Sequence, residues 1–557
     1  MQQLVECVPN FSEGRNRAVI DAIVREIVDT EGVKLLDVDP GADTNRTVVT
    51  FVGTPAGVVE AAFKAIKRAA ELIDMSKHRG AHPRIGATDV CPFVPLAGCT
   101  MADCVALARQ LGARVGEELG IPVYLYEEAA TRPERKNLAD IRQGEYEGLP
   151  EKLKDPAWAP DFGPAVFNPK AGAAVIGARE FLIAYNINLN TRDRRLAQEI
   201  ALNIRESGRL QRDAEGNILR DEHGNPLRRP GKFQAVKAVG WYIPQYKQAQ
   251  VSINLVNYKI TPPHVVFDEV CKEAELLGLR VTGSELVGLI PLEALLMAGR
   301  YYLEKQGRSP GLPEKDLVDI AVRSLGLNDI APFDPAKKII EYQVGERRGT
   351  LVGMDVGGFV DELSTDSPAP GGGSVAALAG ALAAGLAAMV ANLTVGKKGY
   401  EGVASQLKDV AIKAQELKDA LLLAVDEDTR AFNRVMDAFA LPKKSEEQKQ
   451  ARHVAIQEAT RRATEVPAKV MELALQVLEL AMVVAEHGLA NAASDAGVAA
   501  AMARAAVEGA ALNVRINLGS LEDEEFVAAA RSTADRVERQ AKDMAERVLH
   551  VVAGKLS

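Results

Sequence analysis

The chain has 557 residues, a formal net charge of −9 and 26% charged residues. This length exceeds what one hydrophobic core covers, so we expect several domains. The acidic balance provides no basic field for nucleic acid, and an anionic substrate must be held by local Lys, Arg or helix N-termini. The five cysteines include no CxxC pair, which indicates a reducing compartment and argues against a disulfide framework or a structural zinc site.

The N-terminus, MQQLVECVPNFSEGRN, has no basic region followed by an apolar stretch. We therefore expect no signal peptide and a cytoplasmic location. One segment, 374–394, contains no charged residue over a length that could span a bilayer. Because it consists mostly of Ala and Gly, a helix buried among other helices is favoured over a transmembrane helix.

In the first half of the chain, the pattern strand–helix–strand–strand–helix–strand occurs twice. The first set covers 3–8, 15–29, 33–38, 46–52, 55–73 and 90–96, followed by a helix at 102–119 and a strand at 122–126. The second set covers 181–189, 192–206, 233–242, 249–256, 264–277 and 280–287. Both predict a ferredoxin-like βαββαβ subdomain. Two polar turns within 208–232 predict a surface hairpin inserted into the second set.

Beyond residue 328 the alternation ends, and the two prolines of LNDIAPFDPAKKII predict a linker. Ala-rich helical periods then predict an up-and-down helical bundle, with breaks at 371–373, 396–399, 441–442 and 488. The expected fold is α+β followed by all-α. Its expected parts are a first subdomain at 1–180, a second at 181–327, a linker at 328–354 and a helical domain at 355–557.

The first candidate site is the loop KHRGAHPRIGATD, which spans 77–89 between a helix and a strand. It contains two histidines, three basic side chains and two glycines. A titrating imidazole beside cations suits proton transfer near neutral pH, and no second cluster suggests a metal site. His82 is the candidate catalytic residue, and the alternative is a histidine that only anchors the loop by a hydrogen bond.

The second candidate is the loop DFGPAVFNPKAG at 161–172. Its Gly and Pro residues fix an irregular backbone, Phe162 and Phe167 could stack on a flat ring, and Lys170 could meet an anion. A plain connector between the two subdomains explains the loop equally well.

The third candidate is DSPAPGGGS at 366–374, directly before the Ala-rich helix. Three glycines at a helix N-terminus let the backbone approach a carboxylate or phosphate closely. No Gly-Lys-Ser/Thr follows, so the motif is not a P-loop and no nucleotide is expected.

The fourth candidate is the acidic pair Asp426 and Asp428 in the helix predicted around 411–439. At 100° per residue, Asp428 falls near the middle of an apolar stripe, and Asp426 falls on the opposite, polar side. The stripe consists of Leu417, Leu421, Val425, Phe432, Val435, Met436 and Phe439. Burial would raise the pKa of a carboxyl on this stripe and equip it for acid–base work, and a buried ion pair is the alternative.

Together these segments resemble the formiminotransferase–cyclodeaminase family, bifunctional folate enzymes of histidine degradation. The N-terminal resemblance lies in LVECVPNFSEGRN, LLDVDPGADTNRTVVTFVG, KHRGAHPRIGATDVCPFVP, DFGPAVFNPKAGAAVIGAREFLIAYNINL and SELVGLIPLEAL. The C-terminal resemblance lies in DSPAPGGGSVAALAGALAAGLAAMVANLTVGKKGY and AVDEDTRAFNRVMDAFALPK. These long strings extend over nearly the whole chain. Residues 208–232 depart from the compact family pattern but lie outside the motifs.

The resemblance implies two consecutive reactions on one folate. The first part would transfer the formimidoyl group of N-formimidoyl-L-glutamate to N5 of tetrahydrofolate. The helical part would then cyclise the product to 5,10-methenyltetrahydrofolate and release ammonia. His82 matches the family's catalytic histidine and Asp428 its catalytic aspartate, with Asp426 as the fallback. The family's folate-binding loop matches Gly163, Pro164, Ala165, Val166, Phe167, Asn168, Pro169, Lys170, Ala171 and Gly172.

The resemblance also implies a (poly)glutamylated tetrahydrofolate as carrier substrate, no metal, no nucleic-acid or membrane partner, and a homo-oligomer. Two other interpretations of the helical domain stay open. It could be a methenyltetrahydrofolate cyclohydrolase, which shares the GGGS helix, or a non-catalytic oligomerisation scaffold. The glycine turn at 371–373 could hold the anionic glutamate tail or close a subunit interface.

Overall fold

The computed structural model describes residues 3–42, 44–80, 82–345 and 351–556. The chain divides into two compact units, one formed by 1–294 with 325–344 and the other by 295–324 with 345–557. Part of the segment expected to be a linker is helical, with α10 (Pro335–Lys338) and α11 (Ile340–Val344). Residues 346–350 of that segment lie outside the described residues.

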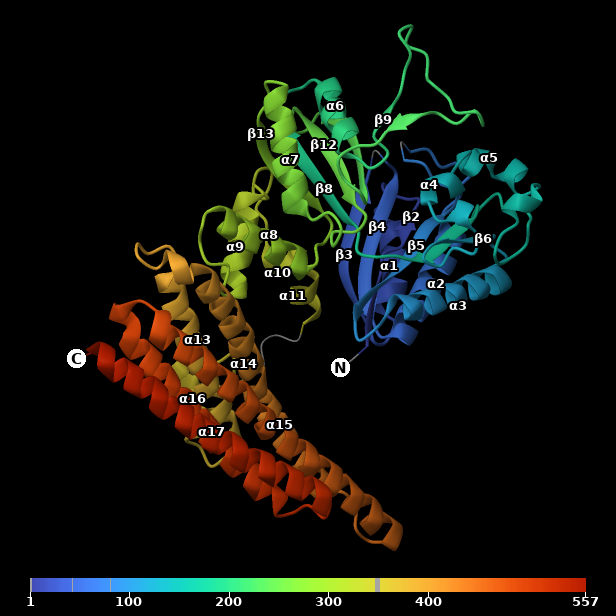
Figure 1. The fold of residues 1–557 in the computed structure, drawn as a ribbon. Coiled ribbons are helices and arrows are strands. Elements are labelled where there is room, and N and C mark those ends of the chain that lie inside the picture. Colours follow the sequence, from blue (N-terminus) through green and yellow to red (C-terminus); the bar gives the residue numbers. More distant parts are fainter. Residues whose placement is uncertain (1–2, 43, 81, 346–350, 557) are drawn as a thin grey trace. The chain divides into compact units, whose positions relative to one another are not determined.

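A seven-stranded mixed sheet forms the centre of the first unit (Figure 1). Its strands are β1 (Leu4–Cys7), β2 (Asn10–Phe11), β3 (Val33–Gly41), β4 (Arg46–Gly53), β5 (Thr88–Ala97), β6 (Val123–Glu127) and β7 (Ala174–Ala178). Across the sheet the order is β3, β4, the β1/β2 pair, β5, β7 and β6. The last three strands are parallel to one another and the other pairings are antiparallel.

Three long helices cover one face of this sheet. The helices are α1 (Arg17–Val28), α2 (Pro55–Leu72) and α3 (Met101–Leu119). Thr54 caps α2 by accepting a hydrogen bond from the Gly57 N–H, with Pro55 at the first helical position. Val49 and Phe51 of β4 pack in the core with the helices, so the alternating Val48 and Thr50 face the opposite side.

The second sheet of this unit has four antiparallel strands in the order β11-β12-β8-β13. Their bounds are β8 (Ile183–Leu189), β11 (Val236–Ile243), β12 (Gln248–Leu255) and β13 (Val281–Val287). Helices α6 (Arg194–Ile204) and α7 (Pro263–Leu276) pack against it. The hairpin expected at 208–232 is confirmed, with β9 (Arg209–Leu210) paired to β10 (Arg228–Arg229) in an arm that projects from the sheet (Figure 1).

The sequence patterns missed several short elements of this unit. Strand β7 lies between β5 and β6, although its five residues are too few for a clear alternation. The helices α4 (Leu138–Ile141) and α5 (Glu145–Lys152) were also not expected. They are too short for a helical period to be recognised.

The second unit is mostly helical. Helix α8 (Leu292–Lys305) spans the division between the units and α9 (Glu314–Ser324) follows. The others are α12 (Val356–Leu363), α13 (Gly372–Thr394), α14 (Ala404–Ala440), α15 (Glu446–His487), α16 (Ala493–Leu518) and α17 (Glu524–Leu556). The four expected breaks fall at the ends of these helices. A further break after Gly519 was missed, because Leu521 and the acidic residues after it continue a helix-like composition.

Helix α13 is long and apolar enough, by length and composition, to cross a membrane. It packs against α14, α15 and α16, and most of its alanines are buried in the core that these helices share. Small side chains allow helices to approach closely, which explains the Ala/Gly composition. The expectation of a helix buried among other helices therefore fits the packing of this segment.

Candidate active sites

A cavity of about 520 Å³ opens on the face of the first sheet opposite α1, α2 and α3. The two sheets of the first unit both contribute to it, since residues of β1, β3 and β4 and residues of β8, β11 and β12 line it. Its titratable and charged lining residues include Glu6, Asp37, Asp39, Arg46, His82, Glu127, Arg142, Arg179 and Lys237. A cavity of this size with converging charged groups is the expected form of a small-molecule site.

His82 lies at this cavity with one ring nitrogen fixed by the backbone. Its Nδ1 is 2.7 Å from the Pro83 carbonyl oxygen. A carbonyl can only accept, so the shorter of the two Nδ1 contacts, 2.7 Å to Pro83 against 3.4 Å to Arg46, assigns the proton to Nδ1 and a lone pair to Nε2 of the neutral ring. Burial, and then the positive charges of Arg46 and Arg142, lower the pKa of His82 to about 4. The imidazole is therefore neutral at pH 7 and ready to accept a proton at Nε2.

Asp89 holds the two arginines beside His82. Its fully buried carboxylate forms ion pairs with Arg46 and with Arg142, and the backbone N–H of Ile85 donates to it at 3.1 Å. Burial alone would raise the pKa of Asp89, but the two guanidinium groups hold it below its ordinary value. One carboxylate between two cations leaves net positive charge next to the imidazole.

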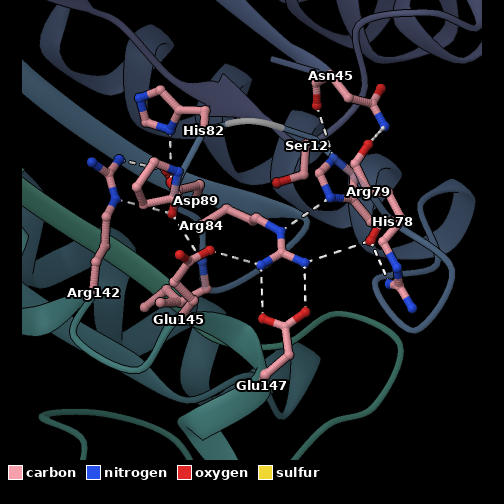
Figure 2. Close-up of polar contacts among 12 residues, drawn as sticks. Ser12, Asn45, His78, Arg79, His82, Arg84, Asp89, Arg142, Glu145 and Glu147 are labelled. Carbon is pink, nitrogen blue, oxygen red and sulfur yellow. Dashed lines mark hydrogen bonds and ion pairs between the residues drawn. The ribbon is translucent and has the colours of Figure 1, made fainter. Parts of the chain in front are cut away.

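The other histidine of this loop has the anchoring role that was considered for His82. His78 contacts the Asn45 carbonyl at 2.8 Å through Nε2, and its Nδ1 accepts from Arg84 Nε at 3.2 Å. Arg84 in turn forms two hydrogen bonds of 2.8 Å with Glu147. Figure 2 shows this anchor on one side of Arg84 and the group of His82, Asp89 and Arg142 on the other. The motif at 77–89 thus combines a structural part and a part at the cavity.

The loop at 163–172 packs beside the His82 loop but does not line the cavity. Its backbone bonds join Lys170 O to Met75 N and Ala171 O to Ala87 N. The Lys170 ammonium donates to the Glu71 carbonyl at 2.7 Å. Phe167 packs against Tyr146 with ring centroids 5.4 Å apart. In this conformation the Phe167 ring and the Lys170 ammonium already contact other groups of the protein.

The helical unit places Asp428 against the N-terminal turn of α13. Asp428 Oδ2 lies 3.2 Å from Ser374 Oγ. Burial raises the pKa of Asp428, while hydrogen bonds from Ser374 act in the opposite direction. The contact depends on a glycine, since a Cβ on Gly373 would lie 2.1 Å from Asp428 Oδ1. Burial therefore favours the protonated carboxyl at this position, whereas the positive end of the α13 dipole and Ser374 favour the carboxylate.

The sequence-based placement of Asp426 on a polar face was wrong. Asp426 is buried and accepts from the backbone N–H groups of Leu351 and Val352 at 3.0 and 3.4 Å. The stripe itself also ends early, because Met436 and Phe439 are about half exposed whereas Ala431 and Ala438 are buried. The buried positions of α14 here hold small side chains because the helices pack closely. Alanine is only weakly hydrophobic, so it contributes little to the apolar periodicity from which the stripe was predicted.

Several cavity residues were not singled out from the sequence. Arg46 follows an expected turn, Asp89 ends the recognised motif, and Arg142 follows a four-residue helix. Arg142 and Asp89 are 53 positions apart, so no local spacing connects them. Glu6 sits in an apolar strand, where a single charged residue was the available signal. Among the described residues, no group of three or more His, Cys, Asp or Glu side chains is arranged to hold a metal ion.

A charged cavity with a neutral histidine in one unit, and a half-buried carboxyl with a raised pKa beside a helix N-terminus in the other, are features typical of an enzyme with two sites. Three family models match the chain. They describe the formiminotransferase domain, N-terminal subdomain, at 4–179, the formiminotransferase domain at 184–345, and formiminotransferase-cyclodeaminase at 355–536.

Whole-chain and partial relatives agree with this division. The chain is 46% identical over 551 residues to a formimidoyltransferase-cyclodeaminase of Gallus gallus, covering 99% of this chain and 98% of the relative. A glutamate formimidoyltransferase of Streptococcus pyogenes serotype M1 is 44% identical over 304 residues, 55% of this chain and 94% of that protein. A methenyltetrahydrofolate cyclohydrolase of Methylorubrum extorquens is 41% identical over 199 residues, 36% of this chain and 96% of that protein.

The chain belongs to the formimidoyltransferase-cyclodeaminase family. It is a bifunctional enzyme with a glutamate formimidoyltransferase part and a cyclodeaminase part.

Proposed function

We propose that this chain transfers the formimidoyl group of N-formimidoyl-L-glutamate to N5 of tetrahydrofolate and then cyclises the product to 5,10-methenyltetrahydrofolate with release of ammonia. The observation that carries the proposal is the full-length match to a bifunctional relative, since it includes both units. Tetrahydrofolate is the acceptor and carrier, in its (poly)glutamylated form. No metal or nucleotide takes part.

His82 is the proposed base of the transfer step. Nitrogen N5 of the folate attacks the amidine carbon, and His82 Nε2 takes the N5 proton as the tetrahedral intermediate forms. The bond from that carbon to the glutamate nitrogen then breaks, and the protonated imidazole returns the proton to the departing nitrogen. The neutral ring, with its proton fixed on Nδ1, supports this assignment.

Binding of the anionic substrates also affects the pKa of His82, and with it the return of the proton. The positive charges of Arg46 and Arg142 keep the pKa of His82 low in the free cavity. A bound carboxylate near these arginines would offset their charge and raise the pKa of the imidazole. Substrate binding therefore favours a ring that can both take and return the proton.

Asp428 is the proposed acid of the cyclisation step. Nitrogen N10 attacks the formimidoyl carbon, and the NH₂ group takes a proton from the Asp428 carboxyl and leaves as ammonia. The Asp428 carboxylate takes up the proton that N10 loses, which restores the acid. Its raised pKa supports this role, and its contact with Ser374 at the start of α13 fixes the position of the carboxyl. Asp426 is the weaker candidate, because two backbone N–H groups already bind its carboxylate.

The loop at 163–172 is the proposed folate-binding segment of the transferase part. It borders the His82 loop through the Ala87–Ala171 hydrogen bond, so it could hold a part of the folate outside the cavity. Val166 at its tip is 67% exposed and is available for such a contact. The glycine turn at 371–373 would bind the anionic glutamate tail or contribute to a subunit interface.

We further propose two ferredoxin-like subdomains, at 1–180 and 181–327, a linker at 328–354 and a cyclodeaminase domain at 355–557. The strand order β11-β12-β8-β13 supports this for the second subdomain, since its first strand in sequence pairs with its third and fourth. The enzyme would act in the cytoplasm as a homo-oligomer, with no nucleic-acid or membrane partner.

Two assays on the whole enzyme test the proposal. Transfer is followed as glutamate release from N-formimidoyl-L-glutamate with tetrahydrofolate, and cyclisation as ammonia release from 5-formimidoyltetrahydrofolate. Both activities are expected in one purified chain. Absence of the first rejects the transferase proposal, and absence of the second rejects the cyclodeaminase proposal.

A cyclohydrolase is the second candidate for the helical unit, because a protein of that name matches this region at 41% identity. It would hydrolyse the methenyl compound rather than release ammonia. Comparing the two rates in the same preparation separates these candidates. A helical unit that only assembles the enzyme would show neither rate.

A further inference from the structure

The cavity beside His82 has charges of opposite sign at different positions along one sheet face. Strand register gives these positions. Asp39 of β3 pairs with Val48 of β4, Asp37 pairs with Thr50, and Glu6 of β1 pairs with Val52. Arg46 begins β4, two residues before the Asp39 position, which corresponds to about 7 Å along a strand. The carboxylates of Asp39, Asp37 and Glu6 therefore lie next to Arg46 along this face of the sheet.

Glu6 is the most unusual of these carboxylates. It is 3% exposed and lines the cavity. Its side-chain carboxylate accepts no hydrogen bond from any residue in the described part of the chain. Burial raises the pKa of Glu6 to about 7, with Arg179 acting against this shift and Glu341 adding to it. A buried carboxyl without a hydrogen-bond donor is costly unless a ligand supplies one.

The surroundings of Glu6 favour a cationic ligand over a neutral one. Burial and then the charge of Asp37 raise the pKa of Asp39, Lys338 acts against this shift and Glu285 adds to it, so several carboxylates influence one another at this side of the cavity. Lys338 and Arg179 act on these carboxylates from a distance, but their own hydrogen bonds go to the Gly288 carbonyl at 3.2 Å and the Glu180 carbonyl at 2.9 Å. Among the described residues, Glu6, Asp37 and Asp39 form no ion pair, which leaves their oxygens available to a positive group of the substrate.

We propose that Glu6, Asp37 and Asp39 form an anionic subsite that binds the cationic formamidine group of the donor. This inference rests on the proposed transferase function. The neighbouring arginines, Arg46 and Arg142, bind a carboxylate of the same molecule. An amidinium offers two parallel N–H donors, which match the two oxygens of a carboxylate in the way a guanidinium does. The formimidoyl product on folate is also a cationic formamidine, so the subsite holds this group before and after transfer.

The subsite predicts how the enzyme distinguishes donors. N-formyl-L-glutamate has nearly the same shape as the donor but carries a neutral formamide in place of the amidinium. A neutral group gains less from the carboxylates, whereas the contacts of its glutamate part with the arginines stay the same. The cost of losing one charged hydrogen-bonded contact is about tenfold or more in binding.

The test uses the whole enzyme with Glu6→Gln and Asp39→Asn as separate variants. The KM for N-formimidoyl-L-glutamate and the inhibition constant of N-formyl-L-glutamate are measured in each. We expect each variant to raise the KM about tenfold or more and to change the inhibition constant less than about threefold. Equal weakening of both ligands, or no weakening of either, would overturn the subsite.

Glu127→Gln is the matched control, because Glu127 lines the same cavity but lies near Lys237 and Arg179. It should leave the ratio of the two constants as in the unaltered enzyme. Denaturant unfolding followed by a probe in the first unit reports whether each variant is folded, and if Glu6→Gln fails to fold, Asp39→Asn alone decides. An unaltered enzyme that does not transfer at all would instead reject the proposed function and is recognised by the assay of that enzyme.

Discussion

The two units surround their candidate proton-transfer groups differently, and both surroundings favour the uncharged form. His82 lies among strands and loops next to two guanidinium groups, and burial with these charges lowers its pKa to about 4. Asp428 lies on a long helix against the first turn of another, and burial raises its pKa. A neutral imidazole accepts a proton, whereas a neutral carboxyl donates one. The same physical cause, desolvation, therefore prepares a base in one unit and an acid in the other.

The comparison predicts the largest effect for His82→Ala. Loss of the base should lower glutamate release by about 10²–10⁴-fold and leave ammonia release from 5-formimidoyltetrahydrofolate unchanged. Folate binding should be largely kept. His223→Gln in the exposed hairpin is the control and should change neither rate. A transfer rate that survives His82→Ala would remove this residue from the mechanism.

Asp428→Asn should affect the other of the two activities. The amide has the shape of the carboxyl but cannot supply the proton, so ammonia release should fall about 10²-fold or more while transfer persists. Asp437→Asn, an exposed position on the same helix, is the matched control. Unchanged ammonia release would remove Asp428 from the mechanism of this step.

A stability measurement sharpens the comparison at the cavity. The pKa of Glu6 is about 7 in the folded protein, above its ordinary value of 4.5. Between these values the unfolded chain has already released the proton that the folded protein keeps, so stability falls as pH rises and is lowest above pH 7. Glu6→Gln removes this loss and should stabilise the first unit by up to about 3 kcal/mol at pH 8, with little effect at pH 4.5.

Denaturant unfolding at the two pH values, followed by a probe in the first unit, measures this difference. A Glu6→Gln variant that is less stable than the unaltered protein at pH 8 would show that the carboxylate stabilises the fold. A more stable variant with weaker donor binding would show that the charge is kept for function at a cost in stability.

Gly373→Ala tests the geometry at Asp428 and should have the smallest effect of the four. Alanine favours helices, but its Cβ would lie 2.1 Å from Asp428 Oδ1 and must displace that carboxyl. Ammonia release should fall roughly tenfold, because a displaced acid transfers its proton less well. Gly385→Ala, where an added Cβ meets nothing within 4 Å, is the control on the same helix.

Local sequence determined much of this protein. The alternating patterns located most strands and helices of both α/β repeats, Thr54 and Pro55 marked the start of α2, and the glycine run marked the start of α13. These signals are readable because they depend on neighbours within about four positions. The loop that carries His82 was found in the same way, from its composition between a helix and a strand.

Tertiary structure alone decided which charges meet. Asp89 joins Arg46 and Arg142 across 43 and 53 positions of sequence, and Asp426 turned out to bind the backbone of Leu351 and Val352 instead of facing solvent. Burial and distant charges set the protonation of a group, and neither is encoded in local periodicity. The sequence therefore indicated where chemistry could occur, while the fold determined the direction in which the pKa of each of these side chains is shifted.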